Sequence, residues 1–372
     1  MQVGVPKEIK NSEFRVGLVP GSVREYVANG HTVMVETGAG AGIKVSDSDY
    51  EAVGAKIAPD AKTVFATSDM IVKVKEPQPS EWAQLREGQI LYTYLHLAPD
   101  PDQARGLIES GVTAVAYETV TDAFGGLPLL APMSEVAGRL SVQAGAYALT
   151  AHQGGRGLLM GGVPGVLPAK VVVIGGGVVG THAARMAVGL GADVTILERS
   201  HRRLTELDDL FEGRAKTRYS TFEALEDETQ NADVVVGAVL IPGASAPKLV
   251  TREMLKSMKE GAVLVDVAID QGGCFETSKA TTHEDPTYVV DGVLHYCVAN
   301  MPGAVPLTSS HALNNATLQY GLRLANKGLD ALRDDPHLRN GLNIHRGMVT
   351  YKAVAEALNV PFTAAEDALA SS

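Results

Sequence analysis

Three glycines near the middle of the chain have the spacing of a loop that binds phosphate groups. Gly175, Gly177 and Gly180 follow an apolar run at residues 171–174, expected to be a buried strand, and precede an expected helix at residues 181–190. Glycines at these positions allow a tight turn, close approach of a pyrophosphate to the backbone, and close packing of the helix on the strand. The amide groups at the start of the helix would then face the phosphates.

A carboxylate stands where such a loop would need one. The next expected strand, at residues 193–197, brings Glu198 to the position of a ribose diol. The alternative, an ordinary glycine-rich turn, leaves Glu198 without an explanation. We therefore predict a dinucleotide site, and the carboxylate favours NAD. The neighbouring Arg199 would suit a 2′-phosphate, so NADP is not excluded.

Four further side chains stand at or just beyond the ends of expected strands, where α/β folds place ligands. Arg15 lies in the loop after the first strand, and Lys75 follows a strand at residues 70–74. His96 follows residues 90–95, and Asp270 follows residues 262–268. Each one alone has a common structural explanation, such as a solvated surface charge or a packed histidine.

Together these four residues meet the needs of one reaction class. Arginine binds a carboxylate with two hydrogen bonds, and lysine holds a carboxylate or polarises a carbonyl oxygen. Histidine transfers protons near neutral pH, and an aspartate can assist it. The set predicts a dehydrogenase for a small carboxylate substrate, either an amino acid or a hydroxy acid.

The elements that must position these residues alternate along the chain. Expected strands lie at residues 2–5, 32–36, 70–74, 90–95 and 112–117, with helices at 22–29, 46–53 and 102–110. The rhythm resumes with strands at 170–174, 193–197, 233–236, 262–266 and 287–290. This alternation predicts an α/β fold with two doubly wound, Rossmann-like domains, each built on a mostly parallel sheet.

Long helices are expected to connect the two domains. A helix at residues 134–153 is rich in small side chains, and helices at 307–327 and 350–358 are expected to return to the first domain. We thus expect a discontinuous substrate domain at 1–133 and 304–372, and a dinucleotide-binding domain at 134–303.

Composition excludes several other classes of protein. The chain has 372 residues and a net charge of -11, which argues against a nucleic-acid partner. Cys274 and Cys297 are expected to be reduced thiols. The chain has no leader-like start, and no apolar run approaches the ~20 residues of a membrane span, so we expect a cytoplasmic protein without a membrane partner. No histidine or acidic pair has metal-ligand spacing, so no metal site is expected.

Six blocks of the sequence resemble alanine dehydrogenases. They are residues 1–20 (MQVGVPKEIKNSEFRVGLVP), 72–77 (VKVKEP), 94–98 (YLHLA), 132–139 (PMSEVAGR), 266–273 (DVAIDQGG) and 298–303 (VANMPG). The resemblance spans essentially the whole chain. It implies NAD-dependent, reversible oxidative deamination of L-alanine to pyruvate and ammonium by a cytoplasmic homohexamer.

The resemblance also implies roles for individual residues. Arg15 and Lys75 would bind the substrate, His96 would be the general acid/base, and Asp270 would be the second catalytic group. Hydride would pass from the alanine α-carbon to the nicotinamide, and water would attack the resulting iminium. The implied cofactor-binding residues, besides Gly175, Gly177 and Gly180, are Ser134, Val178, Val179, Glu198, Arg203, Ser220, Val239, Leu240, Val267, Ala268, Ile269, Asp270, Lys279, Val298, Ala299, Asn300 and Met301. For Ser134, opening a helix as its N-cap is the alternative explanation, and one serine can fill both roles.

Two other interpretations are also compatible with the sequence. The NAD-binding subunit of transhydrogenase has a similar amino-terminal motif, and it would be a membrane-complex partner without an amino-acid substrate. A non-catalytic NAD-binding protein is the second. The blocks around His96 and at residues 132–139 favour the dehydrogenase. One departure from the family pattern is Glu198, where aspartate is usual.

Overall fold

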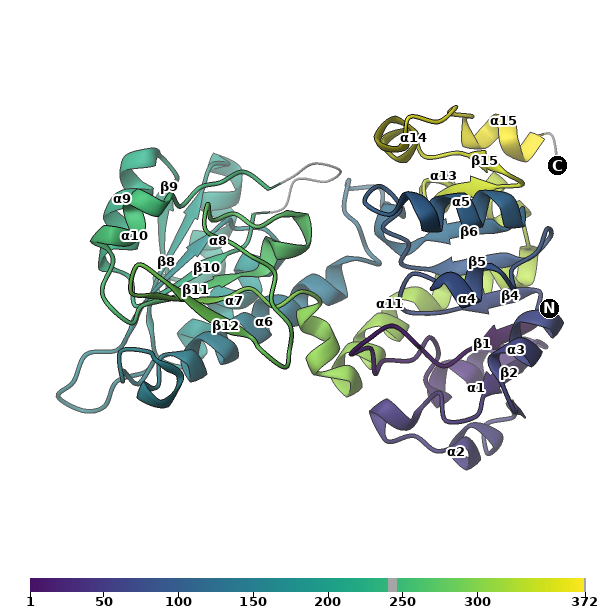
Figure 1. Cartoon of the computed structure of the whole chain (residues 1–372), viewed down its shortest axis with the longest axis horizontal. Coiled ribbons are helices and arrows are strands. Elements are labelled where there is room, and N and C mark those ends of the chain that lie inside the picture. Colours follow the sequence, from purple (N-terminus) through teal and green to yellow (C-terminus); the bar gives the residue numbers. More distant parts are fainter. Residues whose placement is uncertain (240–245, 371–372) are drawn as a thin grey trace. The chain divides into compact units, whose positions relative to one another are not determined.

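The computed structural model describes residues 1–239 and 246–370, and the chain divides into two compact units. The first unit contains Met1–Met133 and Val305–Ser372, and the second contains Ser134–Ala304. Each unit is built on one sheet (Figure 1). The predicted α/β class, with doubly wound and mostly parallel sheets, is confirmed.

The sheet of the first unit has the strand order β15-β14-β6-β5-β4-β1-β2-β3 in the described residues. Strands β1 to β6 are parallel, whereas β14 is antiparallel to β6 and to β15. The strands are β1 (Gln2–Val5), β2 (Thr32–Glu36), β3 (Lys56–Ala58), β4 (Met70–Val72), β5 (Ile90–Thr93), β6 (Thr113–Ala116), β14 (Leu342–His345) and β15 (Met348–Val349).

Helices cover both faces of this sheet. On one face, Ile71 and Leu91 pack against Phe65 of α3 and Leu107 of α5. On the other face, the hydroxyl of Tyr92 donates a hydrogen bond to a carbonyl of α11. The helices of the unit are α1 (Pro20–Ala28), α2 (Asp47–Glu51), α3 (Ala61–Thr67), α4 (Pro79–Trp82), α5 (Pro101–Ser110), α11 (Pro306–Lys327), α12 (Asp330–Asp334), α13 (Pro336–Arg339), α14 (Lys352–Leu358) and α15 (Ala365–Ala370).

The second sheet has the order β12-β13-β11-β10-β7-β8-β9 and is parallel except for β12. Alternate residues of β7 face opposite ways: Val171 and Val173 pack with α6 and α7, and Val172 and Ile174 pack with α9 and α10. The elements are β7 (Lys170–Ile174), β8 (Asp193–Glu198), β9 (Lys216–Tyr219), β10 (Val234–Gly237), β11 (Val263–Asp266), β12 (Thr287–Val290), β13 (Val293–Tyr296), α6 (Ala131–Ala148), α7 (Val178–Gly189), α8 (His201–Phe211), α9 (Phe222–Asn231) and α10 (Arg252–Ser257).

The strand order reverses once in each sheet. In the first unit the parallel strands run β3-β2-β1-β4-β5-β6, and in the second they run β9-β8-β7-β10-β11-β13. Both are the 3-2-1-4-5-6 order of dinucleotide-binding folds, in which ligands bind at the carboxyl ends of the strands beside the reversal. The reversal therefore predicts a ligand site at the carboxyl edge of each sheet.

One strand of the second unit differs from the expectation. We expected residues 287–290 to continue the parallel series, but β12 is an antiparallel edge strand, and β13, which we did not expect, pairs with β11. Asp291 and Gly292 join β12 to β13, and both have positive φ, 49° and 80°. This is the backbone of a two-residue hairpin turn, for which Asp-Gly is a preferred sequence.

Several element boundaries also shift. Helix α7 begins at Val178 rather than at residue 181, and α6 occupies Ala131–Ala148 rather than 134–153. Strand β4 ends at Val72, two residues earlier than expected, and the carboxylate of Glu8 accepts hydrogen bonds from the amides of Val74 and Lys75 beyond it. Among the residues described, no helix is both long enough and apolar enough to cross a membrane.

Gly180 provides a test of how the glycine loop is packed. A Cβ atom at Gly180 would collide with the carbonyl oxygen of Gly175, which is backbone and cannot rotate away. We expect Gly180→Ala to lower the free energy of unfolding by about 1–3 kcal/mol. At Gly189, near the end of the same helix, a Cβ would meet nothing within 4 Å. Gly189→Ala should therefore keep or raise stability. Equal thermal midpoints for Gly180→Ala and the unmodified protein would contradict this packing.

Candidate active site

In the second unit, most residues implied to bind the cofactor follow the carboxyl ends of adjacent parallel strands. The glycine loop follows β7, Glu198 ends β8, and Ser220 follows β9. Val239 follows β10; Val267, Ala268, Ile269 and Asp270 follow β11; and Val298, Ala299, Asn300 and Met301 follow β13. Because these strands are neighbours with the same direction, their ends meet at one edge of the sheet. Leu240 lies outside the described residues.

The glycine loop presents bare backbone at the start of α7. Gly175 has a φ of 100°, which favours glycine, and Gly177 is the N-cap residue of α7. A Cβ at Gly177 would meet nothing within 4 Å, so the space beside this residue is open. The amides of Val178 and Val179 are in the first turn, where helix amides lack intrahelical partners and attract anions.

Glu198 fixes the conformation of the loop. Its carboxylate accepts hydrogen bonds from the amides of Gly176 (2.8 Å), Arg199 (2.7 Å) and Ser200 (2.9 Å). A carboxylate has about four acceptor positions, so roughly one is left for a ribose hydroxyl. The side chain thus ties the glycine loop to the start of α8.

Arg203 holds the same loop from the other side. Its guanidinium donates to the carbonyl of Gly176 and to the hydroxyl of Thr181, both at 2.7 Å. Thr181 in turn donates to the carbonyls of Gly176 and Gly177. Glu198, Arg203 and Thr181 therefore all hold the loop in place through their side chains.

The remaining members of the implied cofactor set differ in exposure. The side chains of Ala268, Ile269, Val298 and Met301 are buried, so any contact with a ligand would come from their backbone. Asp270 is exposed in a 3₁₀ turn, Val267–Gln271. Lys279 is also exposed, and its segment lies beside β13 because the amide of Thr281 donates to Cys297 at 2.9 Å.

Asp266 organises the loop that carries Asp270, a role that the sequence analysis missed. Its buried carboxylate accepts hydrogen bonds from the amides of Ala268 (3.1 Å) and Cys274 (2.9 Å) and from the hydroxyl of Ser278. Burial raises the pKa of Asp266 despite these bonds. The sequence feature that could have indicated this role is the position of Asp266 at the last residue of a buried strand.

The N-cap explanation for Ser134 is wrong. Helix α6 begins at Ala131, so Ser134 lies one turn inside the helix and does not cap it. Its side chain is half-buried. The implied cofactor contact of Ser134 stays a prediction.

In the first unit, the three residues expected to act on a substrate follow three neighbouring strands. Arg15 follows β1, Lys75 follows β4 and His96 follows β5, and these strands are adjacent and parallel. Strands β1 and β4 flank the reversal of strand order. The structure therefore places all three residues at the carboxyl edge of one sheet.

Arg15 is buried against a carboxylate. The guanidinium donates to Glu13 through Nε (2.7 Å) and Nη2 (2.5 Å), and Nη1 lies 3.1 Å from the sulfur of Met133. Burial opposes the charge of Arg15, but the bonds to Glu13 outweigh it and raise the arginine pKa. Glu13 thus keeps a buried cation charged. Its position two residues before Arg15 gives no signal in the sequence.

A fully buried ion-pair triad supports the strand that leads to Lys75. The ammonium of Lys73 lies 2.9 Å from Glu8 and 2.7 Å from Glu81, and none of the three side chains is more than 2% exposed. Burial lowers the pKa of Lys73, but the two carboxylates outweigh this and raise it above its ordinary value. Because Glu8 also accepts from the amides of Val74 and Lys75, the triad fixes the backbone that presents Lys75.

His96 has a constrained backbone and a partly exposed ring. Its φ is 49°, and Glu118 holds this turn by accepting hydrogen bonds from the amides of Leu95 (3.2 Å) and His96 (2.7 Å). The imidazole stacks on the ring of Tyr94, with centroids 5.7 Å apart. Non-glycine residues in this left-handed region concentrate at functional sites.

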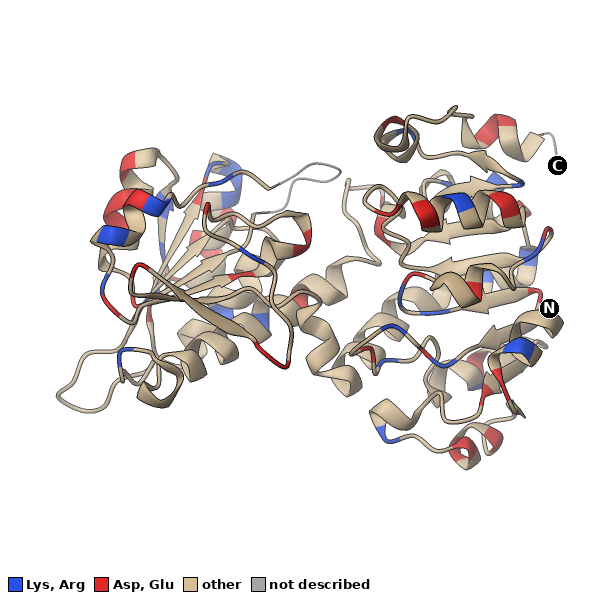
Figure 2. Ribbon diagram, in the orientation of Figure 1, with Lys and Arg blue, Asp and Glu red and all other residues tan. Residues whose placement is uncertain are grey.

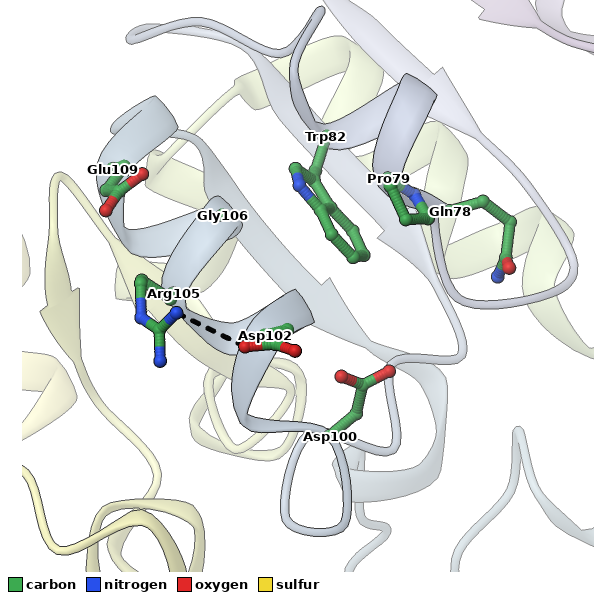
Figure 3. Close-up of a pocket in the computed structure, with 8 residues that line it drawn as sticks. All are labelled: Gln78, Pro79, Trp82, Asp100, Asp102, Arg105, Gly106 and Glu109. Atoms are coloured by element: carbon green, nitrogen blue, oxygen red, sulfur yellow. Dashed lines mark hydrogen bonds and ion pairs between the residues drawn. The ribbon is translucent and has the colours of Figure 1, made fainter.

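A surface pocket of about 600 Å³ lies elsewhere in the first unit, between α4 and α5. None of the predicted site residues lines it. Trp82 and Gly106 are among the residues that line it, and Arg105 pairs with Asp102 at 3.2 Å (Figure 3). Acidic and basic residues alternate along α5 (Figure 2). Its lining holds three carboxylates and one arginine and includes no residue that the sequence or the sheet edge singles out, so we assign this pocket no ligand.

Two doubly wound domains, one of which carries a glycine fingerprint at the carboxyl edge of its sheet, define a two-domain dinucleotide-binding protein. The sequence matches the families described as "Alanine dehydrogenase/PNT, N-terminal domain" over residues 4–137 and "Alanine dehydrogenase/PNT, C-terminal domain" over residues 141–352. The chain belongs to the alanine dehydrogenase/PNT family.

Similar proteins cover the chain from end to end. The alanine dehydrogenase of Halomonas elongata is 59% identical over 98% of this chain and 99% of its own length. That of Bacillus subtilis is 55% identical over 99% of this chain and 98% of its own. A solved L-alanine dehydrogenase superimposes with a TM-score of 0.94 and 53% identity, covering 96% of this chain and 99% of that one. A transhydrogenase from Sinorhizobium meliloti gives 0.82 and 28%, covering 94% and 100%.

The buried triad provides a test of what holds the Lys75 strand. Lys73→Met removes the cation from two buried carboxylates, so we expect the free energy of unfolding to fall by about 3–5 kcal/mol at pH 8. The loss should be smaller at pH 5, where protonation neutralises the carboxylates more readily. Denaturant unfolding at both pH values measures the difference.

Lys256→Met is the matched control, because Lys256 forms an exposed ion pair with Glu253. It should leave the unfolding midpoint unchanged. A Lys73→Met protein as stable as this control would show that the triad does not support the strand.

Proposed function

We propose that this chain is an NAD-dependent alanine dehydrogenase that interconverts L-alanine with pyruvate and ammonium. The observation that carries the proposal is the placement of Arg15, Lys75 and His96 at the ends of three adjacent strands beside the reversal of strand order. A cation pair and an imidazole at one edge suit a small α-amino or α-keto acid. Similarity to alanine dehydrogenases along the whole chain supports the same function.

The second unit has the features that NAD requires. The open space beside Gly177 and the amides at the start of α7 fit a pyrophosphate, and Glu198 fits a ribose hydroxyl. Asp270 would lie in the loop nearest the nicotinamide, as the family resemblance implies. When bound, the cofactor supplies the acceptor for the hydride that leaves the α-carbon of alanine.

The first unit would bind the amino acid and move its protons. Arg15 would bind the carboxylate, and Lys75 would hold the carboxylate and the carbonyl region. His96 in its neutral form would accept a proton when water adds to the carbon that loses the amine, and would return a proton in the reverse direction. Asp270 would be the second catalytic group.

The transhydrogenase interpretation is less well supported. The Sinorhizobium meliloti transhydrogenase shares the fold but is only 28% identical, against 53–59% for the alanine dehydrogenases of Halomonas elongata and Mycobacterium tuberculosis. We also infer, from the family resemblance alone, a homohexamer in the cytoplasm.

The cofactor preference is tested with L-alanine and each dinucleotide. We expect kcat/KM with NAD to exceed that with NADP by about tenfold or more, because a 2′-phosphate would face the Glu198 carboxylate. Absorbance of the reduced nicotinamide measures both rates. Arg199→Ala should lower the rate with NADP further. Equal values for the two cofactors would refute the role of Glu198, and no absorbance change with any amino acid would refute the dehydrogenase function.

The role of His96 is tested by its removal. His96→Ala should lower kcat for L-alanine by about 10²–10⁴-fold, because proton transfer loses its acid/base group. Binding of NADH, followed by its fluorescence, should not change. His152→Ala alters an exposed histidine of the other unit and should keep full activity. Full turnover by His96→Ala would show that another group moves the protons.

A further inference from the structure

One carboxylate, Glu76, lies among the charged residues of the first unit and has no role in the function proposed above. A single oxygen, Oε2, lies 3.6 Å from His96 Nδ1 and 3.8 Å from Lys75 Nζ. The other oxygen, Oε1, accepts a hydrogen bond from the ammonium of Lys10. Glu76 therefore contacts two of the three residues of this unit that we expect to act on the substrate, Lys75 and His96.

The Oε2 atom is unusual because it is buried without a hydrogen-bond partner. The side chain of Glu76 is only 12% exposed, so water does not readily satisfy that oxygen. An unsatisfied buried carboxylate oxygen is costly, and such atoms in folded proteins call for an explanation. The imidazole of His96 and the ammonium of Lys75 lie just beyond hydrogen-bond distance of this oxygen, so a small movement of either one completes a bond.

The surroundings keep Glu76 ionised. Burial by itself raises the pKa of Glu76, but His96, Lys75 and Lys10 outweigh burial and hold the pKa well below its ordinary value. A fixed negative charge beside an imidazole favours its protonated form and selects the tautomer with a proton on the facing nitrogen. That nitrogen is Nδ1, which leaves Nε2 as the atom that exchanges protons with a ligand.

We infer that Glu76 is a positioning residue of this site: its carboxylate orients His96 through Nδ1 and holds the Lys75 ammonium beside it. The catalytic role of this positioning rests on the proposed function, whereas the contacts of Glu76 with His96 and Lys75 do not depend on it. Glu76 touches the acid/base residue rather than the substrate.

Other groups also lie close to His96, and their effects on the imidazole must be distinguished from the effect of Glu76. Tyr94 stacks on the ring, and Glu118 binds the backbone amide of His96 rather than its ring. Lys75 and Lys10 are the cations, and both contact Glu76 itself. Among the described residues of the first unit, Glu76 is thus the carboxylate in ion-pair contact with the imidazole.

The test follows the titration of His96 in the full-length protein without substrate. Histidines are labelled at Cε1 with ¹³C, and the His96 signal is identified by its loss in His96→Ala. We expect Glu76→Gln to lower the titration midpoint by about one pH unit, since the imidazolium loses its anionic partner. The acid limb of kcat/KM for L-alanine should move to lower pH by the same amount, because the neutral base then persists further into acid.

Three more variants separate positioning from mere structure. Glu76→Asp keeps the charge and should recover most of the wild-type midpoint. Glu87→Gln makes the same change at an exposed carboxylate of the same unit, 3.6 Å from Arg346, and should move neither readout. Lys10→Met removes a partly exposed cation that shares the carboxylate, so it should raise the midpoint without disturbing the core.

The outcomes distinguish the pairing from the function. An unchanged midpoint in Glu76→Gln, or a fall in kcat without a shift of the acid limb, overturns the inference even if His96→Ala is inactive. A shifted midpoint in a protein that oxidises no amino acid supports the pairing and removes the proposed function. If Glu76→Gln fails to fold, a midpoint in Lys10→Met that falls or stays constant overturns the inference.

Discussion

In both units the strand order reverses beside the first parallel strand, and the candidate site depends on this constraint. Parallel strands all end at one edge, and the reversal sends the connections on either side of β1, or of β7, in opposite directions. Polar residues that are far apart in the sequence thereby come to neighbouring strand ends. Arg15 and His96 are 81 positions apart by number, yet only β4 separates their strands.

Buried charges then fix what the sheet edge presents. In the first unit, Lys73 is enclosed by Glu8 and Glu81, and Arg15 is paired with Glu13. Such pairs need not add stability compared with apolar residues, but a partner left alone is costly, so they specify one arrangement. The second unit uses the same device with backbone partners, because Glu198 and Asp266 accept hydrogen bonds from amides of the loops that they hold.

Sequence reasoning found the parts of this arrangement that are local. The glycine spacing, Glu198 and the polar residues after strands all follow from short patterns, and the strand order made them neighbours. Glu13, Glu8 and Glu118 were missed because an acidic residue in a loop carries no sign of the partner it will meet. The hairpin of β12 and β13 could have been predicted, because Asp291-Gly292 favours a two-residue turn between strands. Strand β14 is short and pairs with β6, more than 200 positions earlier, and no local pattern indicates such a pairing; β15 joins the sheet only through its neighbour β14.

The discontinuity of the first unit has a consequence for synthesis on the ribosome. Strand β14 pairs with β6 although the whole second unit separates them in the chain. The second unit is continuous, so all of its strands have been translated before Leu342 is reached. It can therefore complete its sheet during translation, while β6 keeps an unpaired edge until β14 arrives. A chain halted when residue 304 has just left the ribosomal exit tunnel would carry one complete nucleotide-binding unit and a first sheet that still lacks β14 and β15 at its exposed edge.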